Sequence, residues 1–199
     1  MMLDKQLQVI GESLLDFDDR THELCEPYTD TLPVKLLDVV SKLGDQPELR
    51  TISAALIAAG TLAGSDRLVR AGARMMIAHE AATFAKDMAK TQIDRRRPRS
   101  ANGRKQKKPK KGNHTAKEMT SFPSGHSAGA IAAARAFSRE FPEYGAPVIG
   151  AAVFIALSQI PRCAHYPTDV AAGLALGLGS EALVNGAWNA TAMDERSAP

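Results

Sequence analysis

The stretch Ser121-Phe-Pro-Ser-Gly-His-Ser-Ala-Gly-Ala-Ile-Ala-Ala-Ala-Arg-Ala-Phe-Ser-Arg-Glu-Phe141 decides the fold. Pro123 ends the preceding loop, and Ser124 is placed to cap the first turn of a helix that we expect to run to Phe141. Alanine and glycine dominate this helix, and such small residues allow neighbouring helices to approach closely. The stretch therefore predicts a tightly packed helix within a bundle.

The segments on both sides of this stretch also have helical patterns. Apolar residues recur at three- and four-residue spacing over 5–19, and a second short pattern covers 36–43. Further helices are expected at 52–64, 66–90, 146–160 and from Pro167 to about Asn189. Alternating runs of β-branched residues are absent. The fold class is therefore all-α, with about five or six helices and the functional site at one end of the bundle.

Composition does not decide whether this bundle lies in water or in a membrane. Of the 199 residues, 44% are hydrophobic and 24% are charged, which supports one folded domain and excludes a disordered chain. No apolar run reaches the ~18–20 residues of a standard membrane span. The segments 52–64, 146–160 and 170–188 come close. Their small residues favour a membrane-embedded bundle, and an alanine-rich soluble bundle is the alternative.

Charge and pattern divide the chain into three parts. Residues 1–50 form an amphipathic N-terminal helical segment, whose first 30 residues carry eight acids against Lys5 and Arg20. Residues 51–189 form the core, and residues 190–199 are a polar tail. The acidic face of the first helix would be repelled by anionic lipid, so we expect this helix to pack on the bundle or on a partner helix.

A basic loop interrupts the core at residues 95–117. It carries eleven Lys and Arg and no acid, and its Pro and Gly residues oppose regular structure. It has no aromatic residue to stack on bases, so we predict no nucleic-acid partner. We expect Arg95, Arg96 and Arg99 to be solvated, and His114 to be exposed.

The start of the helix at Ser124 has the chemistry of an anion site. Gly125 lets an anion approach the free backbone amides, and the helix dipole favours a phosphate there. His126 lies in the first turn, where it can give a proton to a bound group. An ordinary capped helix with a surface histidine is the alternative interpretation.

A second candidate cluster lies before the last helix. His165 and Asp169 are four residues apart and share one face of a helix. A carboxylate that accepts from one imidazole nitrogen leaves the other free as a nucleophile or base. A metal site of His126, His165 and Asp169 is an alternative, but the neighbouring Arg and Lys residues would repel a cation. We therefore predict no metal and no cofactor.

Two cations precede these clusters. Lys90 and Arg97 are seven residues apart and can bring a point charge and a planar fork to one oxyanion. The pattern K-x6-R-P at 90–98, followed by P-S-G-H at 123–126 and H-x3-D at 165–169, resembles the type 2 phosphatidic acid phosphatase superfamily. That family also includes bacterial acid phosphatases and vanadium haloperoxidases.

The resemblance implies a metal-independent phosphohydrolase on a helical core. Lys90, Arg97, Ser124 and Gly125 would bind the phosphoryl oxygens. His126 would protonate the leaving oxygen. His165 would attack phosphorus and form a phosphohistidine, with Asp169 orienting it.

One position departs from the family pattern. The family usually has an arginine six residues before the nucleophilic histidine, and here that position is Gln159. Gln159 can donate one neutral hydrogen bond to phosphate. Arg162, three residues before His165, can supply the missing charge if Pro161 turns the chain inward.

The resemblance also implies a lipid phosphate or pyrophosphate substrate and a location in the bacterial inner membrane. Family members typically act on the periplasmic face, whereas the basic loop favours the cytoplasmic face, so both orientations stay open. A soluble acid phosphatase acting on small phosphoesters is one alternative. A non-catalytic phosphate- or lipid-binding protein is another, motivated by Gln159. The oligomeric state is not predicted.

Overall fold

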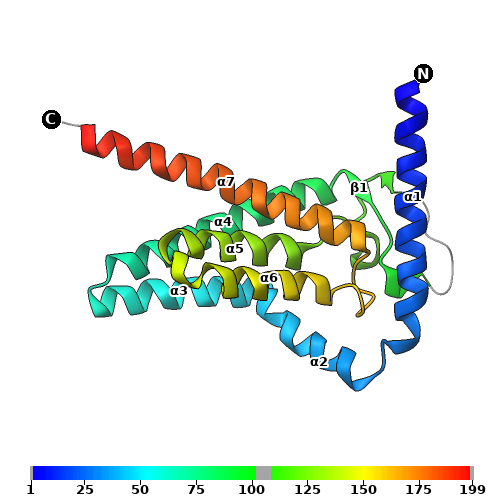
Figure 1. Cartoon of the computed structure of the whole chain (residues 1–199), viewed down its shortest axis with the longest axis horizontal. Coiled ribbons are helices and arrows are strands. Elements are labelled where there is room, and N and C mark those ends of the chain that lie inside the picture. The colour runs from blue at the N-terminus through cyan, green and yellow to red at the C-terminus, as the bar shows by residue number, and fades with distance from the viewer. Residues whose placement is uncertain (1, 102–108, 198–199) are drawn as a thin grey trace.

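The computed structural model describes residues 2–101 and 109–197, which form an all-α bundle (Figure 1). This confirms the predicted fold class. These residues contain seven α-helices, one for each helical pattern found in the sequence and one more than the overall estimate of five or six. The α-helices are α1 (Met2–Cys25), α2 (Leu32–Ser41), α3 (Gln46–Ala63), α4 (Asp66–Lys90), α5 (Gly125–Glu140), α6 (Gly145–Ser158) and α7 (Pro167–Ser197).

Short elements connect these helices. Two-residue strands β1 (Ile93–Asp94) and β2 (Lys110–Lys111) pair in antiparallel fashion. They close the base of the basic loop, of which residues 102–108 lie outside the described residues. The 3-10 turns are η1 (Glu26–Tyr28), η2 (Lys42–Gly44), η3 (Pro98–Ser100), η4 (Lys117–Met119) and η5 (Pro142–Tyr144).

The helix that begins at Gly125 is the centre of the bundle. α5 packs against α4, α6 and α7, and most of its residues are buried. A Cβ added at Gly177 would lie 2.3 Å from the carbonyl oxygen of Ala128, so α7 lies directly on the backbone of α5. The main core cluster is accordingly built from small side chains, with two larger ones: Leu49, Met75, Ala78, Ala82, Ala128, Ala132, Ala133 and Ala136.

Local sequence signals set the helix boundaries. Gly64 ends α3 in the left-handed conformation, with φ of 64°, which glycine adopts without steric cost. The Ser65 side chain then accepts a hydrogen bond from the backbone N–H of Leu68 and caps α4. At α5, Ser124 caps in the same way through the N–H of Ser127, as predicted.

Four helix ends meet at one end of the bundle. α4 and α6 finish there, and α5 and α7 begin there. α1 stands across this same end, close to the start of α7 (Figure 1). The three sequence motifs all lie at these helix ends or in the connections between them, so the fold collects them in one place.

α7 is the part of the bundle with the composition of a membrane span. Within the described residues, one helix is long and apolar enough to cross a membrane, at Pro167–Thr191 with a mean hydropathy of 1.3. Pro142–Ser158 is apolar but shorter. Only 28% of the α7 window is buried inside the protein, so much of this apolar helix faces outward.

Candidate active site

Backbone hydrogen bonds join the first two motifs. The Arg97 N–H donates to the Glu118 carbonyl oxygen at 2.8 Å, and the Ser121 N–H donates to the Arg95 carbonyl oxygen at 2.9 Å. The third motif is joined in the same way, because the Ser124 N–H donates to the Asp169 carbonyl oxygen at 3.0 Å. The three motifs are therefore connected through the main chain, whatever their side chains do.

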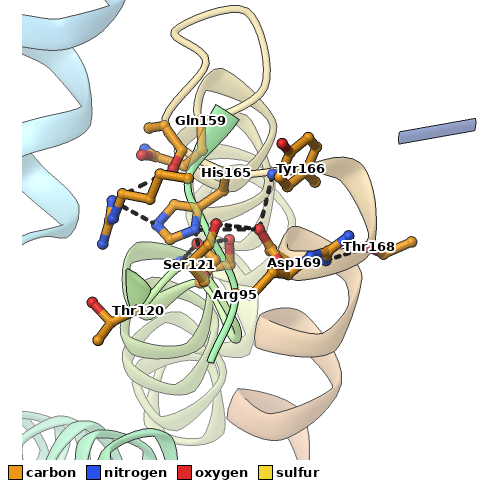
Figure 2. A network of polar contacts seen from close by, with 12 residues as sticks. Arg95, Thr120, Ser121, Gln159, His165, Tyr166, Thr168 and Asp169 are labelled. Atoms are coloured by element: carbon orange, nitrogen blue, oxygen red, sulfur yellow. Dashed lines mark hydrogen bonds and ion pairs between the residues drawn. The ribbon is translucent and has the colours of Figure 1, made fainter. Parts of the chain in front are cut away.

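His165 lies in the middle of this arrangement with its two ring nitrogens in different environments (Figure 2). Its side chain is 2% exposed, and its Nδ1 lies 2.7 Å from the Ser121 carbonyl oxygen. A carbonyl oxygen can only accept, so Nδ1 carries the proton and Nε2 keeps its lone pair. Burial lowers the pKa of His165 to about 4, so the ring is neutral at physiological pH.

Asp169 orients His165 less directly than the sequence predicted. Its carboxylate lies 3.8 Å from Nδ1 of His165, beyond hydrogen-bond distance. It accepts instead from the Ser121 hydroxyl at 2.6 Å and from the Tyr166 N–H at 3.0 Å. The carboxylate thus holds Ser121, and the Ser121 carbonyl holds the imidazole.

Cations lie on the Nε2 side of His165. The Arg97 Nη1 is 3.4 Å from that nitrogen, and the Arg97 Nε donates to the Lys117 carbonyl oxygen at 2.9 Å. Lys90 is the last residue of α4. Burial is the main cause, and together with the charges of Arg97 and Lys86 it lowers the pKa of Lys90 to about 8. Two cations so close together favour an anion between them.

The start of α5 adds a close-packed surface and a lysine that the sequence did not single out. Ser124 is fully buried, and its Oγ also accepts from the Ser127 hydroxyl at 2.8 Å. A Cβ at Gly125 would lie 3.0 Å from Cδ of Lys86. Lys86 is 7% exposed, sits one turn before Lys90, and pairs with Asp87 at 2.9 Å. Lys86 and Lys90 are four residues apart on α4, and this spacing could have indicated that they share one face of the helix.

His126 is held by a residue from the N-terminal segment. Its Nε2 lies 2.6 Å from the carboxylate of Asp45, the residue that precedes α3. Burial lowers the pKa of His126, and the Asp45 charge opposes that effect. Asp45 lies 81 positions away in sequence, and no pattern links the two residues.

Gln159 and Arg162, the two residues where the sequence departs from the family pattern, are hydrogen-bonded to each other. Gln159 is fully buried, and its Nε2 donates to the Ile155 carbonyl oxygen of α6 at 3.1 Å, so its amide N–H is used within the protein. Its Oε1 accepts from Nη1 of Arg162 at 3.0 Å. Arg162 also binds Asp38, and its charge lowers the pKa of His126 and of Arg97. Of these two residues, only Arg162 brings a positive charge that acts on His126 and Arg97.

The expectation that Arg95 is solvated is wrong, whereas Arg96 and Arg99 are exposed as expected. Arg95 is 3% exposed, and its guanidinium bridges the carboxylates of Asp18 and Asp169. Figure 2 shows it beside Asp169 and Thr168. It also donates to the Thr168 hydroxyl at 2.7 Å and lies over the Tyr166 ring, 4.7 Å from its centroid. A buried arginine needs such partners, because an unpaired buried charge is very costly.

Asp18 extends this network to α1. Its side chain is fully buried and accepts from Nη2 of Arg95 at 2.6 Å and from the Thr168 N–H at 3.0 Å. Thr168 lies in the first turn of α7, so the Asp18 carboxylate also caps that helix. The N-terminal helix is therefore fastened to the site by one buried carboxylate.

The charge of the site suits an anion. The charges of Lys90 and Arg97 act on His165, and those of Lys90, Arg97 and Arg162 act on His126. Within the described ranges, no group of three or more His, Cys, Asp and Glu side chains could hold a metal ion. Fixed cations and backbone amides are what a phosphoryl group requires in its transition state, when charge develops on its equatorial oxygens.

This combination of helical bundle and histidine–cation site defines a class of protein. The family model of the PAP2 superfamily matches residues 71–191, which is more than half of the chain. The chain belongs to the PAP2 superfamily.

Individual relatives are similar over different lengths. The lipid A 1-phosphatases of Rhizobium etli and Rhizobium johnstonii are each 46% identical over 57 residues. That stretch is 29% of this chain and 25% and 23% of the two relatives, so the match spans about a quarter of their length.

A solved structure extends the similarity to the whole chain. It is the first transmembrane PAP2 type phosphatidylglycerolphosphate phosphatase from Bacillus subtilis, with a TM-score of 0.62 and 18% identity. The match covers 100% of this chain and 98% of that one, so the two proteins share their fold.

We predict that Asp18→Asn destabilises the protein by about 2 kcal/mol or more, because it removes a charged hydrogen-bond acceptor from a buried arginine. Thermal unfolding of the purified protein measures the effect. Asp16→Asn is the matched control on the same helix, where an exposed pair with Arg20 is lost and the expected change is under about 0.5 kcal/mol. Equal shifts for the two variants would contradict the role given to Asp18.

Proposed function

We propose that the protein is a phosphohydrolase that removes phosphate from a lipid phosphate or pyrophosphate through a phosphohistidine intermediate. Membership of the PAP2 superfamily and the similarity to two lipid A 1-phosphatases support a lipid phosphatase. One observation carries the mechanism. His165 has its Nδ1 proton bound to the Ser121 carbonyl and its Nε2 beside Arg97.

In the first step, the Nε2 lone pair of His165 attacks phosphorus. The bond between phosphorus and the leaving oxygen breaks, and His126, in the imidazolium form that the Asp45 carboxylate stabilises, gives that oxygen a proton. The imidazole then carries phosphate on Nε2 and a proton on Nδ1, so it is positively charged. The Ser121 carbonyl and the Asp169 carboxylate stabilise this charge.

In the second step, a water molecule attacks phosphorus on the phosphohistidine. His126, now neutral, takes the proton of the water, and the bond between Nε2 and phosphorus breaks. Inorganic phosphate leaves, and both histidines return to their starting states. Lys90, Arg97 and the amides at the start of α5 bind the equatorial oxygens throughout, so we propose that neither step needs a metal or a cofactor.

A lipid substrate fits the fold. With α7 crossing the bilayer, the end of the bundle that holds the motifs lies at a membrane surface, where a phosphate headgroup can reach it. We propose the bacterial inner membrane as the location. The resemblance to family members favours its periplasmic face, and the basic segment after Arg95 is the feature that favours the other.

We predict that His165→Asn lowers phosphate release from phosphatidate by about 10³-fold or more, because the amide cannot act as the nucleophile. Phosphate release is measured with purified protein in detergent and EDTA, from phosphatidate and from undecaprenyl pyrophosphate. His114→Asn is the control, because His114 is a largely exposed histidine that pairs with Asp94 on the basic loop. Its activity should stay within about twofold of wild type.

Two results of this assay would contradict the proposal. The first is release that survives in His165→Asn, which would remove this histidine from the chemistry. The second is phosphate or vanadate binding with no release from either lipid by the wild-type protein, which would indicate a binding protein. Loss of all release in EDTA would contradict metal independence alone.

We predict that the KM for a lipid phosphate rises as pH increases above about 8, because the free enzyme then loses the proton and the charge of Lys90. The phosphomonoester is already a dianion there, since its second pKa is about 6. KM is measured between pH 7 and 9.5 in wild type and in Lys90→Arg. The guanidinium stays charged over this range, so the variant should show a flat KM. The same rise in both proteins would rule out Lys90 as its source.

A further inference from the structure

A cationic cavity lies next to residues of the candidate active site. It has a volume of about 230 Å³, and its walls come from three separate parts of the chain. The segment that leads into and forms α2, the turn η3, and the connection between α6 and α7 all contribute. The lining residues are Thr29, Val34, Lys35, Asp38, Arg99 and Arg162.

The charge of this cavity is unbalanced. Lys35, Arg99 and Arg162 bring three positive charges, and Asp38 brings one negative charge. Lys35 and Arg99 are exposed at its mouth, whereas the Arg162 side chain is 10% exposed. The net positive charge within a concave surface favours the binding of a further anion.

Among the described residues, Asp38 is the one acidic residue that lines this cavity. Its carboxylate binds Nη2 of Arg162, and this hydrogen bond is the main cause that lowers the pKa of Asp38. The charges of Lys42 and Arg99 lower the Asp38 pKa further. The guanidinium of Arg162 therefore already binds one carboxylate at this position.

The cavity and the candidate active site share a wall. Arg99 follows Arg97 by two positions, and its N–H donates to the Cys163 carbonyl oxygen at 3.0 Å, two residues before His165. Arg162 lines the cavity, and its charge also acts on His126 and Arg97. A ligand bound at His165 could therefore extend a second group into the cavity.

We propose that this cavity is a subsite for a second phosphate group of the substrate. The inference rests on the proposed function and narrows it to phosphate esters whose headgroup carries a second phosphate. Lys35 and Arg99 bind this second phosphate at the mouth, and Arg162 binds it at the base. Asp38 competes with it, because its carboxylate holds the same guanidinium.

The experiment uses simple probes rather than the natural lipid. Alkanediol bisphosphates with two to six carbons, and the matching alkyl monophosphates, compete with phosphatidate turnover by the full-length protein. A second subsite predicts one chain length at which the bisphosphate inhibits about tenfold more strongly than its monophosphate, the ratio that corresponds to about 1.4 kcal/mol. Equal inhibition at every chain length would overturn the proposal.

Two variants should change this ratio in opposite directions. Lys35→Ala combined with Arg99→Ala should bring the ratio close to one, while inhibition by the monophosphate stays unchanged. Asp38→Asn should raise the ratio, because it removes the competing charge. Arg96→Ala is the matched control, since Arg96 is an exposed arginine of the same loop that does not line the cavity.

The outcomes separate this proposal from the proposed function. Calorimetric titration of the same probes compares mono- and bisphosphates without turnover. A protein that prefers one bisphosphate but releases no phosphate would keep the subsite and lose the hydrolysis. A protein that hydrolyses phosphatidate with no preference for any bisphosphate would keep the hydrolysis and lose the subsite. A ratio unchanged in the Lys35/Arg99 double variant would also overturn the subsite.

Discussion

The buried carboxylate of Asp169 is the interaction on which the rest of the site depends. It sits in the first turn of α7 and accepts hydrogen bonds from Arg95, Ser121 and the Tyr166 N–H. Those donors come from the basic loop, from the segment before α5 and from the segment before α7. A fully buried carboxylate is stable only when its lone pairs are satisfied, so each of these segments must be in place for the charge to be tolerated. The position of His165 follows, because its Nδ1 proton binds the carbonyl of the same Ser121.

The need to pair buried charges also explains why the N-terminal segment is acidic. Asp18 binds Arg95, Asp38 binds Arg162, and Asp45 binds His126, so three of its carboxylates each pair with a basic residue in or next to the site. The cations that suit phosphate repel one another, and these carboxylates offset part of that repulsion. None of the three lies in the region that the family model matches, which begins at residue 71. These carboxylates therefore pair with basic residues of the matched region from outside it.

Sequence alone predicted the parts of this structure that depend on local signals. Ser124 caps α5 and Gly64 ends α3 because each residue acts on its neighbours in sequence. The three motifs identified the family because the residues within each motif lie close together in sequence. Arg95 could not be predicted, since its charge looks solvated until Asp18, 77 positions earlier, is known to lie beside it. The direct acceptor for His165 was missed for a related reason. It is the main-chain carbonyl of Ser121, and a carbonyl has no signature in sequence. The Gln159 side chain donates to the last turn of α6 because that helix ends beside it. Sequence propensity does not predict the end of a helix to within one residue.

The proposed mechanism requires that His165 becomes covalently phosphorylated during turnover. The direct test is to mix the protein with a ³²P-labelled lipid phosphate and to stop the reaction rapidly without acid. The protein is then digested, and the labelled residue is identified by peptide mapping. We expect label on Nε2 of His165, in a bond that is stable in alkali and labile in acid, and no label in His165→Asn. Turnover with no labelled histidine under single-turnover conditions, or label that maps to another residue, would contradict it.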